Sequence, residues 1–142
     1  KLARNGGRAL MTLNQEIGAF LAENKDNESL AVFTDGLGDA QKKLTEATMW
    51  LMQNGMSDPN NAGAGSVDYM HMLGLATLAF MWLKMAVVAQ AKIDEGSTDE
   101  FYSNNLITGR YFMLRMLPML DSHLAKIKTG AEPVMALDAA AF

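Results

Sequence analysis

The stretch SVDYMHMLGLATLAFMWLKMAVVAQA, from Ser66 to Ala91, decides the fold because it is apolar on nearly all sides. It follows a segment rich in turn-forming residues, and nothing inside it opposes a helix except the mild effect of Gly74. Ser66 is a natural N-cap, so we predict a helix over residues 66–93. A helix that is apolar nearly all round is usually buried. The sequence therefore predicts a long central helix in a helical domain, with a face that can also contact something outside the chain.

A membrane-spanning helix is the other explanation for this stretch. His71, Lys84 and Gln90 interrupt it, so the uninterrupted apolar run is about a dozen residues, whereas a bilayer takes roughly 20. We therefore predict that the helix is not transmembrane.

The composition is that of an ordinary globular domain. The 142 residues are 49% hydrophobic and 20% charged, with a net charge of −4, so no basic surface suits nucleic acid. The absence of cysteine excludes disulfides and thiolate chemistry. No signal peptide pattern is visible, and we expect a cytoplasmic protein. The 12 methionines suit adaptable contact surfaces.

Hydrophobic periodicity predicts three further helices, over residues 3–24, 28–54 and 98–129. Four long helices joined by short loops predict an all-α fold, an up-down four-helix bundle with long antiparallel helices. The second helix has the clearest core stripe, at alternating steps of three and four residues: Leu30, Phe33, Leu37, Ala40, Leu44, Ala47 and Leu51.

Local signals predict where these helices end. Gly55 is a suitable C′ residue for the second helix. Ser97 and Glu100 form a capping-box pattern before the fourth helix. Pro118 lies within that helix and should kink it, because proline removes one backbone hydrogen bond. Gly130 should end it, and the apolar tail from Ala131 to Phe142 follows.

Residues 1–142 are predicted to form a single helical-bundle domain. No solenoid repeat and no internal domain boundary are visible. Because the chain begins at Lys1 rather than at methionine, we expect it to be a fragment of a longer protein.

A di-metal helical bundle is the sharpest catalytic hypothesis that the residues allow. Such a centre takes Glu-x-x-His motifs from two helices, and Asp68-x-x-His71 is the one approximation. Asp121 and His123 are two residues apart, which places them on different faces of their helix. We interpret Asp68 as a cap at the helix start and His71 as a partly exposed helix residue. We therefore predict no metal site and no catalytic residue.

Two other features could bind an anion. Gly63-Ala64-Gly65 precedes the central helix and could offer free N–H groups, but it lacks the spacing and the lysine of a phosphate-binding loop. We interpret it as a flexible loop. Arg110 and Arg115 could contact a phosphate group, but an ion pair with Glu46, with Asp68 or with a neighbouring domain is the simpler interpretation.

The two tryptophans raise the question of an acyl pocket. Trp50 and Trp82, with the methionines near them, could line such a pocket. Met and aromatic residues at helical spacing are more often core residues, and we favour that interpretation.

Several segments resemble one protein family: NGGRALMTLNQEIGAFLAENK (5–25), ATMWLMQNGMSDPNNAGAGSVDYMHMLGLATLAFMW (47–82), ITGRYFMLRMLP (107–118) and the ending EPVMALDAAAF. They resemble the additional C-terminal helical domain of bacterial acyl-CoA dehydrogenases, in the class that includes the 3-methylmercaptopropionyl-CoA dehydrogenases. The resemblance covers nearly the whole chain. Its most specific part is the combination of Trp-Leu-Met-Gln-Asn-Gly, Asn-Ala-Gly-Ala-Gly and Asp-Tyr-Met-His.

The resemblance implies a parent flavoenzyme. In such enzymes a glutamate removes the α-proton of an acyl-CoA thioester while the β-hydrogen passes to FAD as hydride. The β-domain, the flavin-binding segments and the stretch carrying the glutamate base have no counterpart here. No catalytic or cofactor-binding residue is therefore transferred, and FAD is expected only in the domains of the parent that this chain lacks.

The implied function is a non-catalytic C-terminal domain that serves domain packing and oligomerisation. Its expected partners are the remaining domains of the parent, which would hold the acyl-CoA substrate, and further copies in a homo-oligomer. An independent helical protein-interaction module is the alternative. The central helix has more apolar surface than a bare four-helix bundle can hide, so the candidate interface residues are Met72, Met81, Trp82 and Met85.

Overall fold

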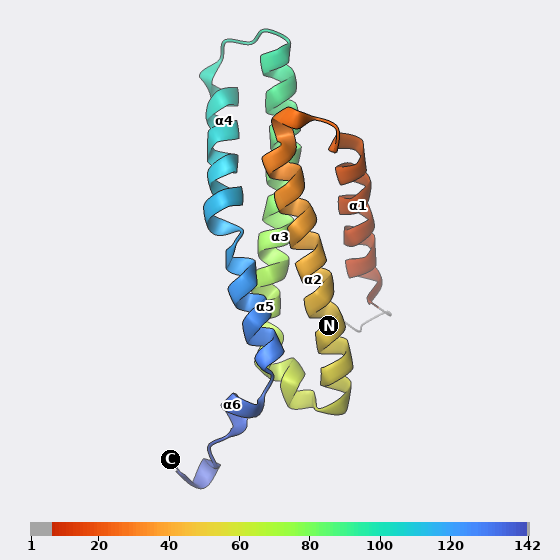
Figure 1. Cartoon of the computed structure of the whole chain (residues 1–142), viewed down its shortest axis with the longest axis vertical. Coiled ribbons are helices and arrows are strands. Elements are labelled where there is room, and N and C mark those ends of the chain that lie inside the picture. Colours follow the sequence, from red (N-terminus) through yellow and green to blue (C-terminus); the bar gives the residue numbers. More distant parts are fainter. Residues whose placement is uncertain (1–6, 142) are drawn as a thin grey trace.

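The computed structural model describes residues 7–141, which contain helices and no strand (Figure 1). The prediction of an all-α fold is confirmed. The start of the predicted helix at residues 3–6 lies outside the described residues. The elements are α1 (Arg8–Asn24), η2 (Glu28–Leu30), α2 (Ala31–Ser57), α3 (Pro59–Asp94), α4 (Glu100–Tyr111), the π-helical turn η3 (Phe112–Met116), α5 (Met119–Thr129), α6 (Glu132–Met135) and η4 (Ala139–Ala141).

The long helices run alternately up and down, and α2 and α3 form the centre (Figure 1). The α4–η3–α5 rod packs on α3 and α2, whereas α1 packs mainly on α2 from the other side. Helices α1 and α4 therefore lie on opposite sides of the central pair. The structure supports the predicted long antiparallel helices without closing them into a four-cornered bundle. One end of α3 and α4 also extends past the turn between α1 and α2.

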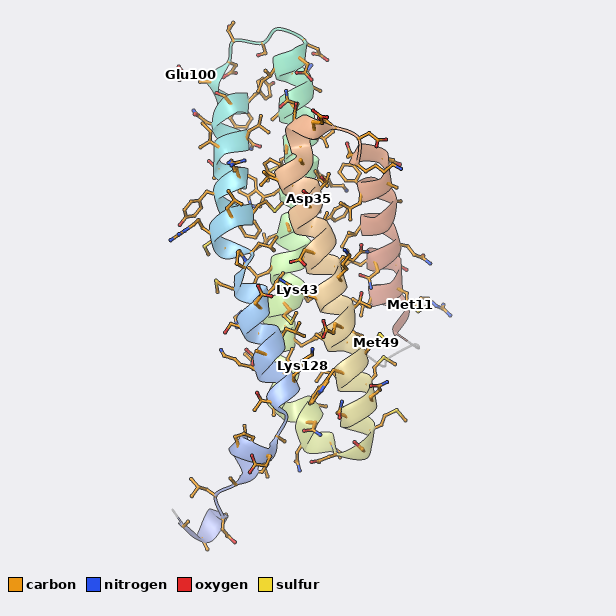
Figure 2. The ribbon with its side chains drawn as sticks, in the orientation of Figure 1. Met11, Asp35, Lys43, Met49, Glu100 and Lys128 are labelled. Atoms are coloured by element: carbon orange, nitrogen blue, oxygen red, sulfur yellow. The ribbon has the colours of Figure 1, made fainter. Side chains whose placement is uncertain are left out.

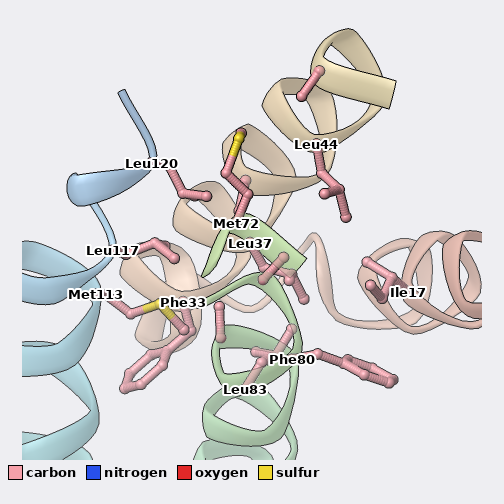
Figure 3. Packing of buried hydrophobic residues seen from close by; sticks show 14 of the residues in the cluster. Ile17, Phe33, Leu37, Leu44, Met72, Phe80, Leu83, Met113, Leu117 and Leu120 are labelled. Carbon is pink, nitrogen blue, oxygen red and sulfur yellow. The ribbon is translucent and has the colours of Figure 1, made fainter. Parts of the chain in front are cut away.

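The core follows the stripe predicted on the second helix. All members of that stripe, from Leu30 to Leu51, are buried. Ile17 of α1, Leu83 of α3 and Leu120 of α5 complete the same cluster (Figure 3). The alternation of three and four residues keeps the stripe on one side of α2, where it meets α3 and α5.

The turn between α2 and α3 is much tighter than predicted. Asp58 has an extended backbone, and its carboxylate accepts a hydrogen bond from the backbone N–H of Asn60 at 2.9 Å. Pro59 occupies the first position of α3, where its fixed φ favours a helix and its missing N–H is not needed. An aspartate cap followed by proline therefore starts the helix well before the predicted position.

Two predictions at this turn are corrected as a result. Ser66 is not an N-cap, because it lies inside α3 and its hydroxyl donates to the carbonyl of Gly63 at 2.8 Å. Gly55 does not end α2, which continues to Ser57. A Cβ at Gly55 would lie only 3.1 Å from the Cβ of Ala62. Gly55 thus allows the start of α3 to pass close to the end of α2.

The fourth predicted helix is divided near Pro118. The N–H of Leu117 donates to the carbonyl of Phe112 at 3.0 Å, an i to i−5 bond that defines the π-helical turn. Where a kink was predicted at the proline, the α-helical pattern is interrupted by an extra residue in the preceding turn.

The ends of this rod also differ in detail from the prediction. Its N-cap is Asp99, which accepts from the N–H of Phe101 at 2.9 Å, so the predicted capping box of Ser97 and Glu100 is wrong. Gly130 ends α5 with a φ of 77°, as predicted.

Candidate functional site

Helix α3 is apolar on two opposite faces. Its inner face packs into the core, where Met72, Ala76, Ala79 and Leu83 are wholly buried. Its outer face carries large apolar side chains that the described part of the chain leaves exposed. These are Val67, Met70, Leu78, Met81, Met85 and Val88.

Seven of the exposed residues of α3 follow a heptad pattern. We define the outer seam by its members, each exposed and separated from the next by alternating steps of four and three: Val67, His71, Gly74, Leu78, Met81, Met85 and Val88. Such spacing repeats every 3.5 residues and is the pattern by which helices pack along each other in coiled coils. The outer seam is therefore suited to contact another helix.

The predicted interface residues divide between the two faces. Met81 and Met85 belong to the outer seam. Trp82 is half-buried, and its ring lies 6.3 Å from that of Phe112. Met72 is 0% exposed and lies among the core side chains in Figure 3, so its prediction as an interface residue is wrong. Each helical residue turns by about 100°, which places Met72 on the side opposite the seam.

Sequence reasoning missed several seam members. Val67, Leu78 and Val88 were absent from the candidate interface set, although their spacing was visible in the sequence. A helix that is apolar on all sides contains several apolar stripes at helical spacing. Only the packing of α2, α4 and α5 on α3 shows which of these stripes stays exposed.

The two histidines of the chain lie together, and one of them, His71, belongs to the outer seam. The rings of His71 on α3 and His123 on α5 stack with centroids 5.2 Å apart and an angle of 6° between their planes. Nδ1 of His123 lies 2.7 Å from Oδ1 of Asp68, and Nζ of Lys126 lies 3.7 Å from the same oxygen. Asp68 therefore fastens α5 to α3, and the prediction that it caps the helix start is wrong.

This cluster is poorly arranged to bind a metal ion. The nitrogens of stacked rings point outward in parallel planes, so they do not converge on one centre, and Nδ1 of His123 already faces Asp68. Among residues 7–141, no group of three potential ligands is placed to hold a metal. Asp121 does lie on a different face from His123, as predicted, because it pairs with Lys43 of α2 at 2.5 Å.

Polar contacts also bind α2 to its neighbours, and the pKa values of two groups respond to them. The hydroxyls of Tyr69 and Thr48 lie 2.7 Å apart. Burial raises the pKa of the Tyr69 phenol, and the hydrogen bond to Thr48 offsets part of that rise. Burial opposes the charge of Lys43, but hydrogen bonds to Asp121 and Asp39 outweigh it and raise the pKa of this ammonium group.

The glycine-rich segment that was considered for anion binding does not form the predicted loop. Gly63-Ala64-Gly65 lies inside α3 rather than in a loop, so its N–H groups belong to the helix. A Cβ at Gly65 would meet Leu51 at 2.9 Å, so this glycine serves the packing of α3 on α2. The prediction of a flexible loop is therefore wrong.

The two arginines of the rod remain at the surface. Arg110 and Arg115 are exposed. Their expected partners are engaged elsewhere, because Glu46 pairs with Lys128 and Asp68 pairs with His123. The ion pairs predicted for the arginines within this chain are not formed among the described residues.

A groove of about 740 Å³ runs beside α2, in the region where Figure 2 labels Met49 and Lys128. Trp50 lines it, but Trp82 does not, so the two tryptophans do not share an acyl pocket there. Both pack against the core from its edge, which confirms the simpler interpretation. The groove mixes charged and apolar side chains: Leu21, Gly38, Gln41, Lys42, Thr45, Glu46, Met49, Trp50, Gln53 and Lys128.

In the described part of the chain, α3 alone is long and apolar enough to cross a membrane, with a mean hydropathy of 1.9 over its best window. In that window, 39% of the residues are buried inside the chain. A single helix of this kind is weak evidence for a membrane span, because the core helix of a soluble protein has the same length and composition.

The structure is an all-helical domain with an exposed apolar seam on α3, and comparison with known proteins gives its family. The family model described as "Acetyl-CoA dehydrogenase C-terminal like" matches residues 13–138. The chain belongs to this family, which confirms the predicted relationship.

Two curated relatives have related sequences. The broad-specificity linear acyl-CoA dehydrogenase FadE5 of Mycobacterium tuberculosis is 29% identical over 151 aligned positions, covering 100% of this chain and 25% of the relative. The 3-methylmercaptopropionyl-CoA dehydrogenase of Ruegeria pomeroyi is 23% identical over 136 positions, covering 95% of this chain and 23% of the relative. The chain therefore spans about a quarter of the length of the relatives it matches.

Proposed function

We propose that this chain is the non-catalytic C-terminal domain of an FAD-dependent, cytoplasmic acyl-CoA dehydrogenase, and that it serves domain packing and oligomerisation. The parent would remove hydrogens from the α and β carbons of an acyl-CoA thioester. The observation that carries the proposal is the outer seam, an uncovered apolar helix face on a domain of this family. A large exposed apolar face typically marks a contact with another protein surface.

The chemistry of the parent is assigned to parts outside this domain. We place FAD in the domains of the parent that this chain lacks, because the glycine-rich segment at residues 63–65 lies within α3 rather than in a loop. The histidine cluster holds α3 and α5 together, and its stacked rings leave no converging acid and base.

The test of the non-catalytic role is an activity assay on the purified chain. FAD, an electron-accepting dye and acyl-CoA thioesters of several chain lengths are added, with an intact acyl-CoA dehydrogenase as the positive control. We expect no dye reduction and no change in flavin fluorescence on addition of the chain. Acyl-CoA-dependent turnover by the chain alone would overturn the proposal.

An independent interaction module is the second candidate, because the outer seam would also suit a separate helical partner. The two candidates differ in the size of the native polypeptide. An antibody raised against the chain should detect a band several times larger than 15.5 kDa in source cells if the chain is a domain of a larger enzyme. A band at the chain's own size would favour the independent module.

A further inference from the structure

We propose that the outer seam is the contact between two copies of this chain, whose α3 helices pack antiparallel about a twofold axis near Leu78. This inference rests on the proposed role in oligomerisation, and it names the surface and the occupant. A symmetric pair of this kind uses the same patch on both partners, so the patch must fit itself.

The spacing of the seam supports a helix as the occupant. The seam runs from Val67 to Val88, about three heptads, and its length is roughly 33 Å at 1.5 Å per residue. Leu78 lies close to its midpoint. A copy of the same helix, reversed about that point, therefore matches it along its whole length.

The sizes of the seam residues are also complementary. Gly74 is exposed in the middle of α3, and a Cβ built there would meet nothing within 4 Å. Glycine at such a position costs about 1 kcal/mol relative to alanine, and nothing within the described residues uses the space it leaves. Reversal about the midpoint of the seam, between residues 77 and 78, places Gly74 opposite Met81 of the partner subunit. A flexible methionine can fill the gap beside a glycine, and the helices can approach closely there.

The charges near the seam permit two copies to meet. The seam itself contains His71 and otherwise only uncharged side chains. The carboxylate of Asp68 beside it faces His123 and Lys126. The ammonium group of Lys84 lies 4.7 Å from the ring centroid of Phe80 and 5.9 Å from that of Phe20 on α1. The net charge of −4 therefore does not concentrate on this face.

The neighbouring rod widens the surface. Phe112, Met116, Met119 and His123 follow steps of four and three, and Phe112 and His123 both contact α3. Met116 and Met119 are exposed between them. Two adjacent helices give a strip roughly 20 Å wide, so the seam and the rod offer on the order of 700 Å² per copy, close to the roughly 800 Å² of a standard interface.

The first experiment compares two glycine variants by sedimentation over a range of concentrations. We expect the unmodified chain to form a dimer, and Gly74→Gln to weaken dimer formation at least tenfold while its helix content is retained. Gly38→Gln is the matched control. Gly38 also lies inside a helix with open space beyond it, but on α2, so this variant should gain the same helix propensity and dimerise normally.

A second experiment tests the antiparallel arrangement, and the absence of native cysteine makes it simple. Under mild oxidation, Leu78→Cys should form a disulfide-linked dimer rapidly, because the two copies of residue 78 meet near the axis. Val88→Cys should not, because an antiparallel pair separates its two copies, whereas a parallel pair would join them. Met49→Cys, exposed on α2, controls for random collision.

The outcomes separate this inference from the proposed function. A chain that stays monomeric at all concentrations overturns the inference, as does equal dimerisation of the Gly74→Gln variant. A monomer that binds lipid vesicles, with binding lost in Gly74→Gln, would also overturn it and assign the seam to a membrane surface. Turnover in the activity assay is the separate result that would overturn the non-catalytic role.

Discussion

The inner and outer faces of α3 are equally apolar but differ in the size of their side chains. The inner face intersperses alanines among larger residues, as at Ala76, Ala79 and Ala86, so that neighbouring helices approach closely. The outer face consists mainly of methionine, leucine and valine, with a single glycine gap. Hydrophobicity alone therefore does not distinguish the buried face from the exposed face of this helix. The two faces are distinguished by the size of their side chains and by the helices packed on each side.

The largest expected effect comes from truncating a leucine on each face. Leu83 is 0% exposed and Leu78 is 51% exposed. Leu83→Ala should lower the free energy of unfolding by about 2–5 kcal/mol, because it leaves a cavity in a packed core. Leu78→Ala should change it by less than about 1 kcal/mol. Urea unfolding at concentrations where the chain is monomeric measures both. Equal losses would mean that the two faces are equally packed within one chain.

The next largest effect is a change in the free energy of unfolding that has opposite signs at two glycines. A Cβ at Gly109 would lie 2.7 Å from Cε1 of Phe33 and 2.9 Å from Cε3 of Trp82. Gly109→Ala should therefore destabilise the chain by about 1–3 kcal/mol through overpacking. Gly74→Ala meets open space and should stabilise the monomer by up to about 1 kcal/mol. Thermal unfolding of the two variants beside the unmodified chain measures the contrast. A gain in melting temperature for Gly109→Ala would contradict the close packing of α4 on the core.

The sequence allowed the core of α2 to be predicted better than the geometry of α3. The stripe from Leu30 to Leu51 is the dominant apolar face of its helix, so its periodicity identifies buried residues directly. In α3 several stripes compete, and Met72 was therefore assigned to the surface although it lies in the core. The start of α3 was missed because the glycines at 63 and 65 suggested a loop, whereas Asp58 and Pro59 set the helix boundary.

The surroundings of Asp68 show a different limit of prediction from the sequence. Its partner His123 is far away in the sequence, and no local pattern reports that α5 will bring the two side chains to 2.7 Å. The spacing of Asp121 and His123 did predict that they face different neighbours, because helical geometry alone decides this. For these residues, the geometry of one helix was predictable from the sequence, whereas the pairing of two helices was not.

The smallest effect concerns the inner hydroxyl pair of Tyr69 and Thr48. Tyr69→Phe should lower the free energy of unfolding by about 0.5–1.5 kcal/mol near neutral pH, because one hydrogen bond is lost. Tyr111→Phe, at an exposed position on α4, is the matched control for loss of a phenol hydroxyl and should cost less than about 0.5 kcal/mol.

The pH dependence of the stability of the same variant tests whether water is excluded from the inner face at Tyr69. Burial raises the pKa of Tyr69 above its usual value of 10.0, so the folded state favours the protonated phenol. This contribution to stability is present below pH 10 and is lost as the pH rises through the higher folded-state pKa. The unmodified chain should therefore lose stability above pH 10 more steeply than Tyr69→Phe, as measured by urea unfolding from pH 8 to 11. Parallel curves would indicate that the phenol is as well solvated as one on the outer face, and the difference between the two faces would then not extend to this end of α3.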